Sequence, residues 1–186
     1  MPKENKRILG IDPGTNILGF GVIDVDKKGA HYVSMGVIDM RKIEDPFEKL
    51  SKIFTEIGRI IDEYLPDNVA VESPFYGKNA QVILKLGRAQ GAAITAAMTR
   101  NIPVFEYAPR RAKVAITGNG AASKEQVSLM IQKTLKVELD AKHLDATDAL
   151  AIAMCHYYQL HNPLFSVKGA SSWEKFVSEN PDRIKK

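Results

Sequence analysis

The chain has 186 residues, enough for one domain with a hydrophobic core and a short tail. Hydrophobic residues make up 45% of it and charged residues 26%, a balance typical of globular proteins, and no apolar run approaches the roughly 20 residues that span a bilayer. Because the first ten residues also lack the apolar stretch of a secretory signal, we expect a cytoplasmic protein. Its one cysteine, Cys155, is predicted to be a small buried side chain.

Basic residues are concentrated in the middle of the chain. Lysine and arginine number 26 against 22 acidic residues, which gives a formal net charge of +4. The segment from Lys78 to Lys142 is more basic than the chain as a whole, because acidic residues are sparse there. A basic middle region is compatible with a polyanionic partner but does not require one.

Three strands in an antiparallel meander are predicted for the first part of the chain, over Arg7–Asp12, Leu18–Val25 and His31–Met40. Lys27, Lys28 and Gly29 form the hairpin between the second and the third. The apolar spacing of Asp45–Leu65 is helical, and its first two residues supply a capping side chain and a proline at the first helical position.

The remaining chain alternates between strands and helices and then ends in two helices. The predicted elements are the strand Asn68–Glu72, the helix Ala80–Arg100, the strand Ile102–Tyr107 and helices at about Lys124–Leu135 and Ala141–Leu160. This order predicts an α/β fold with a mixed five-stranded sheet flanked by helices. We expect residues 1–160 to form one domain and residues 161–186 to form a C-terminal tail or an accessory helix.

Two glycines, Gly87 and Gly91, lie four residues apart inside the predicted helix Ala80–Arg100. Glycine in a helix interior costs about 1 kcal/mol relative to alanine, so their presence suggests that another backbone approaches closely. That backbone could belong to the sheet of the same chain or to a second subunit.

Four carboxylates occupy positions that could converge. Asp12 ends the first strand and Glu72 ends the fourth, while Asp145 and Asp148 share one face near the start of the last helix. Anions brought together would repel and raise each other's pKa values, and hard cations such as Mg²⁺, which take oxygen ligands, would relieve that repulsion. Two such ions roughly 3.5–4 Å apart could support an in-line phosphoryl displacement.

Each acid also has a simpler interpretation. Asp12 begins an Asp-Pro-Gly sequence that is typical of a β-turn, and Glu72 could be a solvated strand end. Asp145 and Asp148 could serve only to complement the helix dipole. Their joint occurrence at these positions favours the metal site.

At these residues the sequence resembles the RuvC family of Holliday-junction resolvases, within the RNase H-like nuclease superfamily. The matching segments are ILGIDPGTNILGFGVI, VAVESPFYGKNAQVILKLGRAQGA, VFEYAPRRAKVAITGNGAASKEQV and HLDATDALAIA. The resemblance implies an RNase H-like fold and a Mg²⁺-dependent crossover junction endodeoxyribonuclease. Such an enzyme resolves four-way DNA junctions in recombination and repair by paired phosphodiester hydrolysis.

The resemblance also implies roles for individual residues. The metal-binding catalytic set, with two Mg²⁺ ions per site, would be Asp12, Glu72, Asp145 and Asp148. Phe75 would contact the centre of the junction, and Lys113 and Lys124 would bind phosphate. Lys78, which follows the aromatic loop, is a further expected DNA contact. His143 could assist at the metal or the phosphate, or could simply face solvent, so it is not counted in the catalytic set. The implied partners are junction DNA, a second copy in a twofold homodimer and a branch-migration helicase complex.

Three alternatives come from other classes of protein. The segment Asp12–Thr15 followed by an apolar strand also resembles the first phosphate loop of actin-like ATPases and sugar kinases. Those proteins need two such domains and a second phosphate loop, for which 186 residues leave no room. A second alternative is an RNase H-like nuclease that acts on other branched nucleic acids. A third, a junction-binding module without catalysis, is disfavoured by the retention of all four acids.

Overall fold

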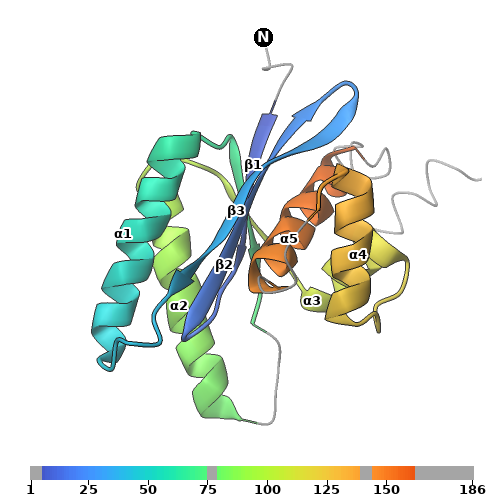
Figure 1. Ribbon diagram of the computed structural model, residues 1–186. Helices are drawn as coiled ribbons and strands as arrows, with labels where there is room; N and C mark the ends of the chain where they lie inside the picture. The colour runs from blue at the N-terminus through green and yellow to red at the C-terminus, as the bar shows by residue number, and fades with distance from the viewer. Residues whose placement is uncertain (1–5, 75–78, 139–143, 162–186) are drawn as a thin grey trace, which may run out of the picture.

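A mixed sheet of spatial order β3-β2-β1-β4-β5 forms the centre of the computed structural model, which describes residues 6–74, 79–138 and 144–161 (Figure 1). The strands are β1 (Lys6–Asp12), β2 (Ile17–Asp26), β3 (Gly29–Asp39), β4 (Asn68–Glu72) and β5 (Val104–Tyr107). Strands β1, β2 and β3 pair antiparallel, whereas β4 runs parallel to both β1 and β5. The predicted meander and mixed five-stranded sheet are therefore confirmed.

Helices cover both faces of this sheet (Figure 1). They are α1 (Pro46–Tyr64), α2 (Ala80–Met98), α3 (Pro109–Thr117), α4 (Lys124–Leu135) and α5 (Leu144–Leu160). Because side chains alternate along a strand, Leu9 and Ile11 pack with α1 and α2, whereas Ile8 packs with α3, α4 and α5 on the opposite face. None of the described helices has the length and hydropathy needed to cross a bilayer.

The starts of α1 and α4 are fixed by side-chain caps. Asp45 Oδ1 accepts hydrogen bonds from the backbone amides of Phe47 and Glu48, at 2.7 and 2.8 Å, as the Asp-Pro sequence predicts. Ser123 and Gln126 form a capping box, in which each side chain accepts from the other residue's amide, at 3.3 and 2.9 Å. This cap fixes the position of Lys124, the first residue of α4.

Helix α3 was not predicted from the sequence. It begins at Pro109 and ends at Thr117, and the next residue, Gly118, adopts the left-handed conformation with φ 74°. Proline at the first position and glycine just past the end are common at helix boundaries, and these two residues are the sequence signal that could have indicated the helix. The helix is short and buries only Ala112 and Ile116, so its apolar periodicity is weak.

Helix α5 lies directly against β1 and β2 because the strands present glycine at the contact. A Cβ atom on Gly10 would lie 2.0 Å from the carbonyl oxygen of Ala149, and one on Gly19 would lie 2.1 Å from that of Asp145. No larger residue fits at either position unless the helix moves away. The glycines thus bring the helix that carries Asp145 onto the strand end that carries Asp12.

The glycines of α2 have a different environment. A Cβ atom on Gly87 or Gly91 would meet no atom of the described residues within 4 Å. The expectation that the sheet of the same chain approaches them is therefore wrong within the described structure. Contact with a second subunit stays a prediction.

One buried polar pair joins α5 to β5. His156 Nδ1 lies 2.7 Å from the Tyr107 hydroxyl, and His156 Nε2 has no hydrogen-bond partner among the described residues. Burial, helped by the charge of Lys6, lowers the pKa of His156 to about 4. The neighbouring Cys155 is 2% exposed, which confirms it as a small buried side chain.

Candidate active site

Three of the four predicted carboxylates meet at one end of the sheet. Asp12 is the last residue of β1, and Asp145 and Asp148 lie in the first turns of α5. One carboxylate oxygen from each of the three lies within 4.8 Å of the other two. The convergence expected from the strand end and the helix face is present.

The fourth carboxylate, Glu72, lies beside this set of three but is not part of it. It ends β4, the parallel neighbour of β1, and it lines a cavity of about 200 Å³ together with Asp12 and Asp148. The backbone oxygen of Glu72 accepts a hydrogen bond from Gln90 Nε2 at 3.2 Å, so α2 supports this strand end. Gln90 is buried, and no motif in the sequence marks it as a residue of the site.

Burial and mutual repulsion raise the pKa values of these acids. The pKa of Asp12 rises to about 8, first because the group is buried and then because Glu72 and Asp148 are close. The pKa of Glu72 rises to about 7 for the same reasons, with Asp148 as its main repelling neighbour. Burial also raises the pKa of Asp148, against the opposing effect of Lys124. The cluster is therefore poorly neutralised near neutral pH, which is the condition that a bound cation relieves.

Lys124 partly balances this negative charge. Its Nζ forms an ion pair with Asp148 Oδ2 and lies 3.6 Å from Asp145 Oδ1. Burial alone would lower the pKa of Lys124, but the contact with Asp148 and the charges of the other acids outweigh it, so the pKa is raised. The side chain thus stays an ammonium in contact with the acids.

Lys113 lines the same cavity from α3. Its Nζ donates to the backbone oxygen of Ala122 at 2.8 Å, which ties α3 to the segment before α4. Both predicted lysines in the described residues therefore border the acidic cavity. Phe75, Lys78 and His143 lie outside the described residues, so the roles expected for them stay predictions.

The donor set suits a hard divalent cation. All the converging side chains offer carboxylate oxygens, the ligands that Mg²⁺ and Mn²⁺ prefer, and no sulfur or imidazole ligand joins the described set. The raised pKa values of Asp12 and Glu72 show that the acids lack enough positive charge of their own. Two lysines at the rim add a place for a phosphate.

Comparison with known proteins decides the family. The family model described as crossover junction endodeoxyribonuclease RuvC matches residues 8–156. The chain belongs to the RuvC family. The RuvC protein of Bacteroides fragilis is 50% identical over 99% of this chain and 98% of its own length, and that of Cytophaga hutchinsonii is 49% identical over 99% and 91%.

Solved RuvC structures share the fold. The Thermus thermophilus RuvC structure superposes with a TM-score of 0.74 at 33% identity, covering 83% of this chain and 95% of that one. T. thermophilus RuvC in complex with Holliday junction substrate gives 0.74 at 30% identity, covering 84% and 95%. These matches confirm the RNase H-like fold and the resemblance found in the sequence, and they favour it over the ATP-binding alternative.

Proposed function

We propose that this chain is a crossover junction endodeoxyribonuclease that resolves four-way DNA junctions in recombination and repair by metal-dependent phosphodiester hydrolysis. The observation that carries the proposal is the convergence of Asp12, Asp145 and Asp148 beside Glu72, in a chain of the RuvC family. The T. thermophilus RuvC that shares the fold was solved with a Holliday junction substrate. The proposal includes a cytoplasmic location.

The metal would be Mg²⁺, two ions per site, held by Asp12, Glu72, Asp145 and Asp148. When bound, such ions activate a water molecule and stabilise the leaving oxygen. The four carboxylates supply oxygen ligands from two strand ends and one helix, so the fold sets their spacing. Lys113 and Lys124 would bind DNA phosphates beside the reacting bond, and Phe75 and Lys78 would contact the junction from the segment after β4.

A homodimer is part of the same proposal, because a junction with paired scissile phosphates suits a twofold symmetric enzyme. Helix α2 is a candidate interface. Leu84 on this helix is 58% exposed, Met98 is 56% exposed, and the space around Gly87 and Gly91 is open among the described residues. A branch-migration helicase complex would be a further partner.

Substrate choice tests the proposal. Equal concentrations of end-labelled four-way junction, three-way junction, flap and RNA–DNA duplex are incubated with the full chain and Mg²⁺. We expect paired nicks in the four-way junction at a rate well above that for the other substrates. Faster cutting of a flap or an RNA–DNA duplex would assign the chain to the other branched-nucleic-acid nucleases instead.

A further inference from the structure

A second, larger hollow lies at the same end of the sheet as the acids, on the face covered by α1 and α2. It has a volume of about 350 Å³ and lies between the β1–β2 loop and the N-terminal halves of the two helices. We call it the basic groove, and its polar and charged lining is Thr15, Asn16, Glu44, Lys49, Lys85 and Arg88. Three cations thus face one acid in this lining.

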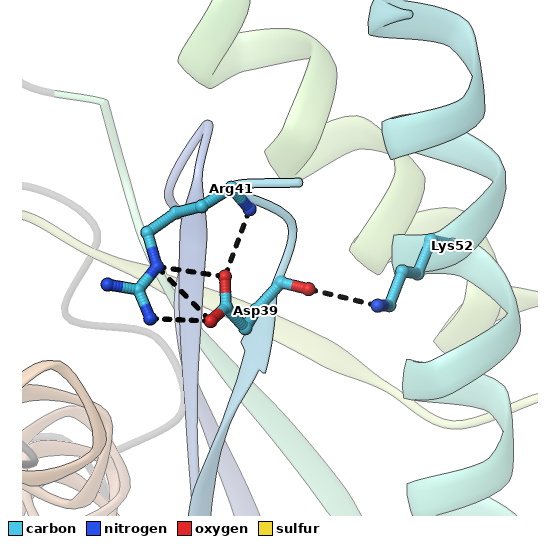
Figure 2. A network of polar contacts seen from close by, with 3 residues as sticks. All are labelled: Asp39, Arg41 and Lys52. Atoms are coloured by element: carbon cyan, nitrogen blue, oxygen red, sulfur yellow. Dashed lines mark hydrogen bonds and ion pairs between the residues drawn. The ribbon is translucent and has the colours of Figure 1, made fainter. Parts of the chain in front are cut away.

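Two of these cations have no charge partner among the residues that the structure describes. Lys85 and Arg88, both exposed on α2, make no ion pair with another described residue. By contrast, Arg41 after β3 is paired through Nε and Nη2 with both oxygens of Asp39, at 2.6–3.1 Å (Figure 2). Lys85 and Arg88 therefore present uncompensated positive charge to the groove, which attracts an anion.

The wall of the groove is already ordered. Lys49 Nζ donates to Asn16 Oδ1 at 2.7 Å, and the backbone oxygen of Asn16 accepts from the amide of Met40 at 2.8 Å. Lys52 on α1 donates to the backbone oxygen of Asp39 at 2.9 Å, so the helix is held to the end of β3 (Figure 2). A ligand that enters the groove need not order these groups, which lowers the entropy loss on binding.

The groove also has an apolar part. Leu50, Ile53 and Ala89 also line it, and Phe47, a further lining residue, is 70% exposed. A positively charged groove with an accessible aromatic ring is the combination that binds strands of nucleic acid, since phosphates meet the cations and a base or sugar meets the ring.

Geometry links the groove to the acidic cavity. A hollow of about 130 Å³ lies between them, lined by Glu72, Pro13 and Leu86 among others. Glu72 belongs also to the acidic cavity, whereas Leu86 is next to Lys85 in α2 and Pro13 is two residues before Thr15. A DNA strand that left the acids past Glu72 would run along this hollow toward the helix that carries Lys85 and Arg88.

We propose that the basic groove binds the phosphate backbone of a DNA strand that continues from the acidic cavity, with Lys85 and Arg88 as its main contacts. The inference rests on the proposed nuclease function and adds a DNA contact on the opposite face of the sheet from Lys113 and Lys124. Arg88 can bind a phosphate through two N–H groups, whereas Lys85 contributes a point charge.

The test is the salt dependence of junction binding by the Lys85→Ala/Arg88→Ala double variant, measured in EDTA so that no cutting occurs. Each phosphate contact contributes about 0.9 to the slope of log affinity against log salt, so the slope should become shallower by about 1.8. The matched control is Lys6→Ala/Lys28→Ala. It removes the same charge at the start of β1 and in the β2–β3 turn, at the opposite end of the sheet, about 20 to 30 Å away along the strands at about 3.3 Å per residue, and should leave the slope unchanged.

Every other outcome counts against the groove. An unchanged slope in the double variant overturns the proposal, and an equal change in the control reduces the effect to overall charge. A changed sedimentation-derived dimer dissociation constant with an unchanged slope would assign the groove to a second copy of the chain. If the wild-type chain itself binds no junction, the proposed function fails and the groove with it. Circular dichroism and the melting temperature show whether each variant is folded.

Discussion

Lys124, the first residue of α4, forms an ion pair with Asp148 on α5 across the acidic cavity. Its Nζ also lies 3.6 Å from Asp145, so this ammonium contacts two of the three carboxylates that converge. A divalent cation would need the same oxygens. Under the proposed function, lysine and metal would therefore compete for these acids until a DNA phosphate gave Lys124 another partner.

Replacing Lys124 with methionine should strengthen metal binding in the absence of DNA. The side chains are half exposed at Lys124 and partly buried at Asp148, and such pairs contribute up to about 1 kcal/mol, or roughly fivefold in affinity. Calorimetric titration with Mn²⁺ or Mg²⁺ measures this directly. Junction cutting should fall in the same variant because a phosphate contact is lost.

Lys113→Met is the control for this competition. Lys113 lines the same cavity, but its Nζ is bonded to the backbone oxygen of Ala122 instead of a carboxylate. We expect a smaller gain in metal affinity than for Lys124→Met. If both variants bind metal equally well, removal of positive charge explains the effect and direct competition does not.

Asp148→Asn and Glu72→Gln should each reduce cutting below detection while junction affinity in EDTA changes little. The amide keeps the shape of the side chain but removes the charge that a hard cation needs. Because burial raises the pKa values of both acids, their ionised forms disfavour the metal-free fold, and neither variant should melt at a lower temperature in EDTA. Near-normal cutting by either variant would exclude that residue from the site.

Gly19→Ala should displace α5 and with it the acids. The new Cβ atom would lie 2.1 Å from the backbone oxygen of Asp145, so we expect destabilisation of about 1–3 kcal/mol and weaker metal binding. Urea unfolding and metal titration measure the two effects. Full metal affinity in a folded Gly19→Ala variant would show that this close contact does not position Asp145.

Gly87→Ala serves as a matched substitution in open space. For the isolated chain it should stabilise α2 by about 0.5–1 kcal/mol, because alanine restricts the unfolded chain and favours the helix. If a second subunit packs on this face, the same change should weaken the dimer. Sedimentation equilibrium with and without the substitution distinguishes the two situations.

The sequence placed the acids well because each lies at the boundary of a strongly patterned element. Asp12 and Glu72 end apolar strands, and the three-residue spacing of Asp145 and Asp148 puts them on one face of a helix. The basic groove could not be predicted, because it combines Thr15, Lys49 and Lys85 from segments far apart in the chain. Only the packing of α1 against α2 brings these residues together.

The glycines also show what the sequence cannot predict, namely which element packs against a small residue. A pattern of small residues indicates that something can approach, but not what does. Gly10 and Gly19 meet α5 in the structure, whereas Gly87 and Gly91 meet nothing among the described residues. Their sequence neighbourhoods do not distinguish these cases, since the difference arises from which elements pack on which face.

His156 should make the fold sensitive to acid. Its pKa in the folded chain is about 4, below the ordinary value of 6.5, so the unfolded chain binds more protons between these two values. Stability contributed by the neutral imidazole is present above pH 6.5 and is lost as the pH falls toward 4. The nearby Tyr107 and Cys155 stay neutral over this window, because burial raises their pKa values to about 12 and about 11.

The acidic cluster changes the stability of the fold with pH in the opposite direction, over an overlapping pH range. The experiment must therefore separate the two contributions. The raised pKa values of Asp12 and Glu72 mean that the folded chain holds more protons than the unfolded chain from about pH 4 to pH 7 or 8, so their effect lowers stability as pH rises. The stability of the wild type measured against pH therefore combines two opposing contributions.

His156→Gln keeps a hydrogen-bonding side chain toward Tyr107 but does not titrate in this range. We expect the wild type to lose up to about 3 kcal/mol more unfolding free energy than this variant between pH 7 and pH 4. Urea denaturation in EDTA measures both free energies. A difference that stays constant over that range would show that the folded and unfolded chains protonate His156 alike.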